Sequence, residues 1–248
     1  MAFKDHFSGH AGSYARYRPD YPSEMFQYLA TLTPRHEIAL DCATGSGQAA
    51  VGLARHFDRV VATDGSVAQL RNAQAHPHVA YLANLAEQPA LKDGSVDLAA
   101  AAQAAHWFDH ARFHPEMRRV LRADGVLALW TYGLAFVAPP IDAVVRHFYD
   151  EVVGPYWPPE RRHVESAYRD LPFPWHDVPG PQFQLRLEWT LDDFIGYVST
   201  WSATQRYTKV SGADPLPSLR AEIAPLWGAD TRPVVWPLHL RVGRPEEK

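Results

Sequence analysis

The segment from Ile38 to Gln48 constrains this chain more than any other part of the sequence. It reads IALDCATGSGQ, which is a short apolar run, a carboxylate at Asp41, a loop of small residues and the start of a helix-forming stretch. Glycines let a backbone approach a ligand closely, and the first turn of a helix offers unpaired N–H groups. The segment therefore predicts a strand, a tight turn and a helix start that together bind a nucleotide-like cofactor.

The glycine spacing by itself fits two cofactors. Gly45-x-Gly47-x-x-Ala50 matches the dinucleotide fingerprint, and Asp64 follows at about the expected distance of roughly 20 residues. Asp41 favours the other cofactor, because a carboxylate just before the glycines repels a pyrophosphate and attracts an ammonium and a sulfonium. We therefore predict S-adenosylmethionine in preference to NAD.

The charge and cysteine content narrow the class of protein. The formal charge of -4, without a run of Lys or Arg, indicates no nucleic-acid partner. Cys42 is the only cysteine, which excludes an intrachain disulfide and fits a reducing compartment. The sequence has neither a signal peptide nor an apolar run of the roughly 20 residues that cross a bilayer. We expect a cytoplasmic protein with a small-molecule substrate and no membrane partner.

Strands and helices alternate along the first half of the chain. Strands are predicted at 38–41, 59–64, 79–83, 96–101 and 126–130, and a helix capped by Ser66 is predicted at 67–75. Pro115 indicates that the helix before the fifth strand begins only there, and Gly125 suits its C-terminal end. His106, His110 and His114 would then share no helical face, so no metal site is predicted. The alternation implies a mostly parallel sheet with helices on both faces.

The second half of the chain is rich in proline and aromatic residues, so the limits of its helices and strands are harder to predict. We expect residues 1–35 to form an N-terminal flap and a first helix, 36–132 the cofactor-binding core, 133–182 a cap region, and 183–248 the completion of the sheet. A strand at 183–189, a helix at 191–207 and a last strand at 234–242, after a broken segment around Pro225, are predicted. Arg161, Arg162 and Arg169 of the cap could hold an acidic substrate, although a solvated charged face is the usual explanation.

Several motifs occur in an order typical of one superfamily. They are Tyr17-Arg18-Pro19-x-Tyr21-Pro22, the loop at 41–48, Asp64, Ala86-Glu87, Ser95-Val96-Asp97-Leu98, Ala104-Ala105-His106-Trp107-Phe108 and Val120-Leu121-Arg122-x-Asp124-Gly125. In these motifs the chain resembles the class I S-adenosylmethionine-dependent methyltransferases, and within them the small-molecule branch of trans-aconitate methyltransferase-like proteins. The segment around Trp201 extends the resemblance to the last third of the chain.

The resemblance implies an α/β fold and a set of cofactor contacts. The implied fold is a Rossmann-like sheet of seven strands, mostly parallel with an antiparallel last strand, with helices on both faces and a helical cap after strand five. The implied contacts are Asp41, Ala43, Thr44, Gly45, Gly47, Gln48, Asp64, Ala86, Glu87 and Ala104. Among them the loop would surround the methionine part, Asp64 the ribose and Ala86 the adenine. Two residues depart from the family pattern, since Ala43 replaces a glycine and Leu85 replaces an acid or amide.

Methyl transfer from a sulfonium requires mainly alignment and the exclusion of water, so a dedicated catalytic residue can be absent. His106 is the candidate general base for a hydroxyl acceptor, with packing as its alternative role, and a carboxylate acceptor needs no base. The predicted substrate pocket consists of Tyr14, Tyr17, Arg18, Trp107, Phe108, Trp130 and Trp201. Three functions remain open on the sequence: methyl transfer to a carboxylate or hydroxyl, nicotinamide-dependent oxidation and reduction, and silent cofactor binding.

Overall fold

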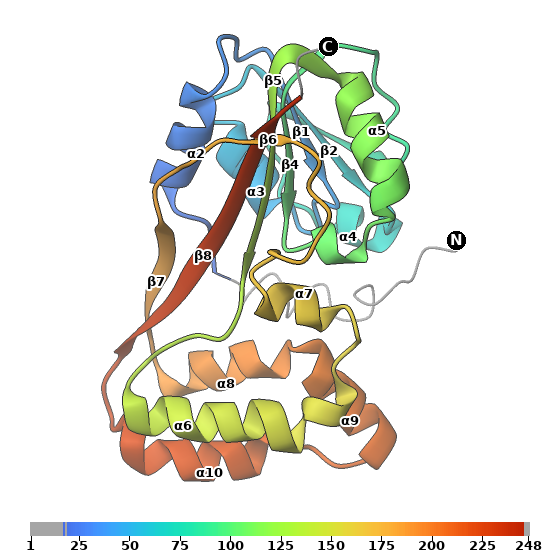
Figure 1. Ribbon diagram of the computed structural model, residues 1–248. Coiled ribbons are helices and arrows are strands. Elements are labelled where there is room, and N and C mark those ends of the chain that lie inside the picture. Colours follow the sequence, from blue (N-terminus) through green and yellow to red (C-terminus); the bar gives the residue numbers. More distant parts are fainter. Residues whose placement is uncertain (1–16, 18, 246–248) are drawn as a thin grey trace.

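The computed structural model describes residue 17 and residues 19–245 of the chain (Figure 1). Tyr14 and Arg18, which we expected in the substrate pocket, lie outside the described residues. None of the described helices is both long enough and apolar enough to cross a bilayer.

The sheet follows the predicted plan. Its parallel strands are β1 (Ile38–Cys42), β2 (Arg59–Asp64), β3 (Val79–Ala83), β4 (Val96–Ala102) and β5 (Leu121–Tyr132). The last strand, β8 (Arg232–Arg244), pairs antiparallel with β5, and β6 (His176–Asp177) and β7 (Phe183–Trp189) pair antiparallel with opposite ends of β8. The strand order is β3-β2-β1-β4-β5-β8-β6, with β7 also paired to β8. The prediction of a mostly parallel sheet with an antiparallel last strand is therefore confirmed.

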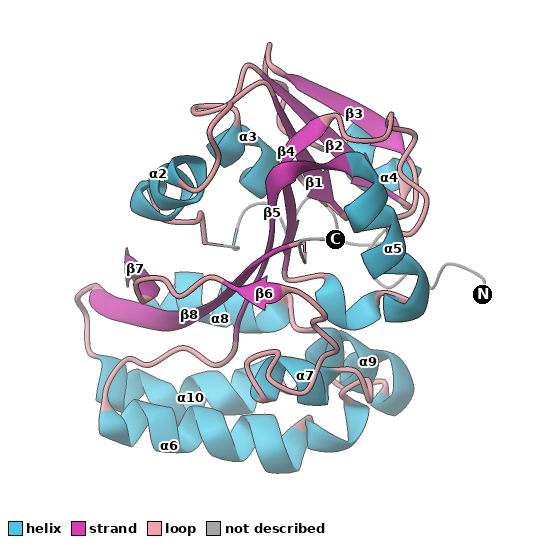
Figure 2. Cartoon of the chain, turned by 45° about the horizontal axis from the view of Figure 1, so that its top comes forward, coloured by secondary structure: helices cyan, strands magenta, loops and turns pink. Residues whose placement is uncertain are grey.

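Alternate residues of each inner strand enter two separate cores. Val126, Ala128 and Trp130 of β5 pack on the side of α2 (Ser23–Thr31) and α3 (Gln48–Leu53). Leu127 and Leu129 pack on the opposite side, with α5 (His110–Val120). Figures 1 and 2 show these helices on the two faces of the sheet. This burial of both faces explains why the strands read as continuous apolar runs.

The helix α5 begins earlier than the sequence indicates. Asp109 caps it by accepting a hydrogen bond from the backbone N–H of Ala111, and Pro115 lies inside it. The cap and the burial of Phe113 outweigh the one backbone hydrogen bond that the proline removes. His110 and His114 consequently share a face and their rings stack at 5.2 Å, whereas His106 lies before the helix. Gly125, expected at the end of this helix, lies within β5.

A layer of four helices packs beneath the long strands β7 and β8 (Figure 1). It consists of α6 (Pro139–His147), α8 (Leu191–Ser199), α9 (Ser202–Ser211) and α10 (Leu216–Trp227). The helix predicted at 191–207 is therefore two helices, which separate at Thr200 and Trp201. The segment around Pro225, which we expected to be broken, forms the helix α10. Pro225 lies in the last turn of this helix, and Leu219, Ile223 and Trp227 are buried.

The remaining elements are short. The helix α4 (Val67–Arg71) lies between β2 and β3, and the turn η2 (Ala105–Trp107) lies between β4 and α5. The turns η3 (Phe148–Val152) and η4 (Gly154–Tyr156) and the helix α7 (Arg161–Glu165) follow α6. The turn η2 directly follows β4, and α7 contacts it. Through this contact the chain beyond β5 reaches the carboxyl edge of the sheet.

Candidate cofactor site

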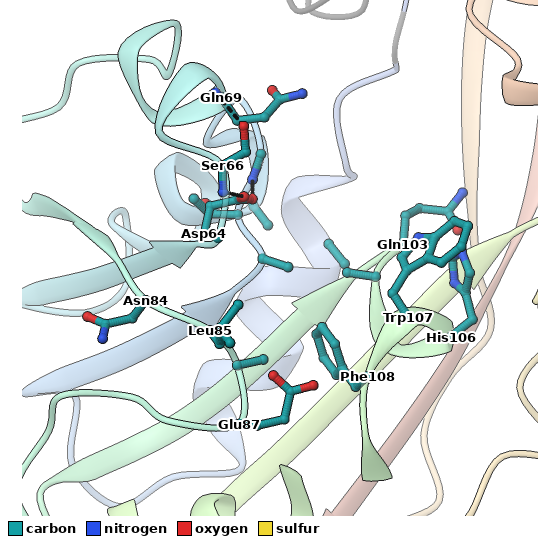
Figure 3. Close-up of a pocket in the computed structure, with 18 of the residues that line it drawn as sticks. Asp64, Ser66, Gln69, Asn84, Leu85, Glu87, Gln103, His106, Trp107 and Phe108 are labelled. Atoms are coloured by element: carbon teal, nitrogen blue, oxygen red, sulfur yellow. Dashed lines mark hydrogen bonds between the residues drawn. The ribbon is translucent and has the colours of Figure 1, made fainter. Parts of the chain in front are cut away.

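A cavity of about 570 Å³ lies at the carboxyl ends of β1, β2 and β4. Its size falls within the range of roughly 300–1,000 Å³ that is typical of small-molecule sites. Figure 3 shows Asp64, Ser66 and Gln69 on one side of it and Gln103, His106 and Trp107 on the other. Ligands of open α/β sheets bind at this edge, so the cavity is the candidate site.

The loop after β1 is built from left-handed residues. Ala43, Gly45 and Gly47 have φ angles of 54°, 56° and 85°. Ala43, which replaces a glycine of the family pattern, is therefore strained, because this conformation costs an L-residue about 1–2 kcal/mol. A Cβ on Gly45 would meet no atom within 4 Å, whereas a Cβ on Gly47 would lie 2.2 Å from the hydroxyl of Tyr81. Gly45 thus leaves open space at the cavity, and Gly47 permits close packing behind the loop.

Asp41 lies beneath this loop and is fully buried. Thr44 Oγ1 donates a 2.5 Å hydrogen bond to Asp41 Oδ2, and Oδ1 accepts no hydrogen bond from any described residue. Burial raises the pKa of Asp41 to about 7, opposed by the Thr44 hydrogen bond and assisted by the nearby charge of Asp64. Asp41 does not line the cavity itself, but Thr44 does. Any effect of Asp41 on a ligand is therefore exerted through Thr44 and through its charge.

Asp64 fastens the glycine loop to the end of β2. Its Oδ2 accepts the backbone N–H of Gly45 at 2.9 Å, and its Oδ1 accepts that of Ser66 at 2.7 Å. Ser66 in turn caps α4, accepting the backbone N–H of Gln69. Each carboxylate oxygen has a second lone pair, so Asp64 can still accept hydrogen bonds from ligand hydroxyls at the cavity surface.

The loop after β3 forms the floor of the cavity. Asn84, Leu85, Ala86 and Glu87 all line it. Glu87 Oε1 accepts the backbone N–H of Asp109 at 2.9 Å, which ties this loop to the start of α5. Leu85 lacks the acid or amide that the family pattern has at its position, but the preceding residue, Asn84, carries an amide. Among the described residues this amide makes one long hydrogen bond, of 3.4 Å to Gln88 O.

His106 stands at the aromatic end of the cavity. Its Nδ1 is 2.8 Å from the hydroxyl of Tyr168. Burial, with smaller contributions from the charges of Arg161 and His163, lowers the pKa of His106 to about 3. The imidazole is therefore neutral near pH 7, and so low a pKa is poorly matched to a general base that works near neutral pH, which favours the packing role.

Most of the predicted site residues meet at this cavity. Those that line it are Ala43, Thr44, Gly45, Gln48, Asp64, Ala86, Glu87, Ala104, His106, Trp107 and Phe108. Trp201 lines an adjoining recess. Trp130 is fully buried and packs against Phe26 and Tyr21, so its predicted place in the substrate pocket is wrong. Tyr17 does not line the cavity and packs on Gly196 of α8.

Several lining residues were missed by the sequence analysis. Those with polar side chains are Ser46, Ser66, Gln69, Asn84, Gln103, Asp109, His110, Arg112 and Glu160. Ser66 and Asn84 adjoin predicted contacts, and their nearness to the ends of β2 and β3 could have indicated them. Glu160 comes from the distant segment before α7, where no motif marks it. Among the described residues, no three His, Cys, Asp or Glu side chains are grouped so as to hold a metal ion.

Comparison with known proteins agrees with this geometry. The methyltransferase domain family matches residues 40–129. A Dictyostelium discoideum protein that carries a methyltransferase name is 35% identical over 222 residues, which cover 88% of this chain and 84% of the relative. The chain belongs to the S-adenosylmethionine-dependent methyltransferases. A solved methyltransferase structure from Anaeromyxobacter dehalogenans is 46% identical, with a TM-score of 0.86, over 92% of this chain and 97% of that one.

This methyltransferase has relatives in fungi as well. Saccharomyces cerevisiae CRG1, named as an S-adenosylmethionine-dependent methyltransferase, is 27% identical over 238 residues, with 82% of each chain covered. The family membership confirms the predicted enzyme class, and it decides between the two cofactors that the glycine spacing allows. The nicotinamide-dependent alternative is set aside.

Proposed function

We propose that this methyltransferase transfers the methyl group of S-adenosylmethionine to a small-molecule acceptor, at a carboxylate or a hydroxyl, as in the trans-aconitate methyltransferase-like branch that it resembles. The observation that carries the proposal is the continuity of the cavity. One space extends from the loop at Gly45 and the carboxylate of Asp64 to Trp107 and Phe108. A polar end suits the cofactor, and an aromatic end suits a small organic acceptor.

The residues present fit the cofactor. With a pKa of about 7, Asp41 is about half ionised near neutral pH, and a ligand that carries an ammonium would favour its ionised form. The open space at Gly45 lets the backbone approach the methionine part, and Asp64 can accept the ribose hydroxyls. Ala86 lines the cavity in the position proposed for the adenine. On this proposal residues 36–132 form the cofactor-binding core.

The bound sulfonium would supply a methyl group that is already activated for displacement. The task of the chain is then to align the acceptor and to exclude water. His106 and Trp107 contribute to exclusion, since they close the end of the cavity after β4. The low pKa of His106 suits a carboxylate acceptor better than a hydroxyl, because a carboxylate attacks without losing a proton.

Two glycines provide a matched test of the cofactor site. Gly45 and Gly94 have φ angles of 56° and 58°, and a Cβ on either would meet no atom within 4 Å. Gly45→Ala and Gly94→Ala therefore introduce the same backbone strain, about 1–2 kcal/mol. Only Gly45 lines the cavity. Calorimetry with S-adenosylmethionine and S-adenosylhomocysteine is expected to show wild-type affinity in Gly94→Ala and a loss of at least about tenfold in Gly45→Ala.

The acceptor half of the proposal needs a turnover assay. Wild-type protein is incubated with S-adenosylmethionine and a panel of carboxylic acids and small alcohols and phenols, and S-adenosylhomocysteine is quantified by mass spectrometry. Methylation of members of the panel supports the proposal. Tight cofactor binding without any turnover would favour a silent cofactor-binding protein, and equal cofactor affinity in the two alanine variants would place the site elsewhere.

A further inference from the structure

A second hollow, of about 50 Å³, adjoins the cavity. The two share Gln103, His106 and Trp107 in their walls. A single water molecule needs about 10–15 Å³ of such space, so this recess has room for a small group. Its remaining walls include Arg161 and Trp157 from the chain after β5 and Trp201 between α8 and α9.

Arg161 is held in this recess by aromatic contacts. Its guanidinium carbon lies 4.6 Å from the ring centre of Trp157 and 5.4 Å from that of Tyr149. Its Nε donates a 2.7 Å hydrogen bond to the hydroxyl of Tyr149, which in turn donates to Glu165 at 2.6 Å. Stacking and this single bond fix the plane of the guanidinium group.

The two terminal nitrogens of Arg161 are left with their donors available. Neither makes a hydrogen bond or an ion pair with any residue that the structure describes. The side chain is partly exposed, so the terminal nitrogens are open to a ligand that enters the recess. A fixed guanidinium whose terminal N–H groups line a hollow is suited to bind a carboxylate through two parallel hydrogen bonds.

His106 forms a second wall of the same recess. Its Nδ1 lies 2.8 Å from the hydroxyl of Tyr168, and that hydroxyl also interacts with Thr131 and with the backbone N–H groups of His106 and Ala105. These contacts hold the imidazole in place beside the recess.

The backbone around the recess is strained. Gln103 and Tyr168 have φ angles of 53° and 61°, although neither is glycine. Gln103 Nε2 donates a 3.0 Å hydrogen bond to Tyr132 O, and Tyr168 is fully buried, so both conformations are held by packing and hydrogen bonds. Left-handed residues of this kind are concentrated at ligand sites, where the surrounding structure keeps them in place.

We propose that this recess binds a carboxylate of the methyl acceptor at the guanidinium of Arg161, beside the imidazole of His106. The inference rests on the proposed function and narrows it to acceptors that are anionic. Trp157 and Trp201 then limit the size of the group that enters, while the body of the acceptor occupies the larger cavity. Arg161 is the residue that selects for negative charge.

The test compares two neighbouring arginines of α7. Arg161→Gln removes the guanidinium from the recess, and Arg162→Gln removes an exposed guanidinium that does not line it. Both are assayed with carboxylic acids and with the matched primary amides, as KM and kcat from S-adenosylhomocysteine release and as binding to the S-adenosylhomocysteine complex by calorimetry. Arg161→Lys is added, because it retains the charge without the planar fork.

Wild-type and Arg162→Gln proteins are expected to prefer the acids. Hydrogen bonds to charged groups contribute about 1.5–3 kcal/mol, so Arg161→Gln should raise the KM or Kd for acids about 10- to 100-fold. Arg161→Lys should fall between the two. Affinity for S-adenosylhomocysteine should not change in any variant, which also shows that each one is folded.

The outcomes separate this inference from the proposed function. The assignment of the recess would be overturned if wild-type protein bound acids and amides equally well. It would also be overturned if Arg161→Gln and Arg162→Gln had equal KM and Kd values for acids. In both cases cofactor binding would stay intact. If the wild-type protein binds neither S-adenosylmethionine nor S-adenosylhomocysteine, the proposed function fails and this inference fails with it.

Discussion

The ionisation of Asp41 gives the cofactor-free protein a pH dependence of stability that one substitution can isolate. Burial raises the pKa of this carboxyl from 3.8 to about 7. Between about pH 4 and pH 7 the folded chain keeps the Asp41 proton, whereas the unfolded chain releases it. The contribution of Asp41 to stability is therefore present below about pH 4 and is lost as the pH rises to 7.

The size of this effect follows from the difference in pKa. The change from 3.8 to about 7 corresponds to about 4 kcal/mol, of which about 3 kcal/mol is lost between pH 5 and pH 8. Asp41→Asn keeps the shape of the side chain but cannot ionise, and its oxygen can still accept the Thr44 hydroxyl. Its amide N–H groups would have no partner, at a cost of about 1–3 kcal/mol that does not vary with pH.

Urea unfolding at pH 5 and pH 8 measures the prediction directly. The free energy of unfolding of Asp41→Asn should rise by about 3 kcal/mol relative to wild type between these two pH values. Asp58→Asn, at an exposed carboxyl before β2, provides the control for a change in net charge. Parallel pH profiles of wild type and Asp41→Asn would refute the reasoning, because Asp41 would then have an ordinary pKa in the fold.

Three further predictions concern the loop and the sheet. Ala43 has a φ angle of 54°, so Ala43→Gly should relieve backbone strain and raise the Tm by about 2 °C in calorimetry. A lower Tm would contradict the claim that Ala43 is strained. Gly47→Ala should lower the free energy of unfolding in urea by about 2–4 kcal/mol, because its Cβ would lie 2.2 Å from Tyr81 Oη. The double variant with Tyr81→Phe should recover part of this loss. Asp97 is buried, accepts two backbone N–H groups and pairs with Arg122 at 2.8 Å. Asp97→Ala should therefore lower the free energy of unfolding by about 2–4 kcal/mol in the same assay. A change below about 0.5 kcal/mol would contradict this prediction.

The elements that the sequence predicted correctly have a clear local pattern of apolar, polar and turn residues. The strands β2, β3 and β7 begin and end at the predicted residues, because each is a short apolar or alternating run with turn residues at both ends. The loop from Asp41 to Gln48 was recognised for the same reason. Its function depends on residues that are adjacent in the chain, so spacing alone describes it.

The errors occurred where packing outweighed a local signal. A helix was expected to begin only at Pro115 and another to be broken at Pro225, yet both prolines lie inside helices whose apolar faces are buried. Trp130 was placed in the pocket because it ends a strand, but the alternation of side chains along β5 directs it into the core with Phe26. The local penalty at each proline is smaller than the burial that the helix gains.

The sequence by itself predicted the alternation of strands and helices in a mostly parallel sheet and the glycine loop with the acids Asp41 and Asp64, and it favoured S-adenosylmethionine. These features depend on residues close along the chain or on a repeated alternation of elements. Only the tertiary structure decided which side chains meet at the recess beside His106. Arg161 and Tyr168 reach His106 across more than fifty positions of sequence, and no periodicity records such a meeting. Their positions depend on how the chain after β5 folds back onto η2, and that is set by packing of the whole helical layer.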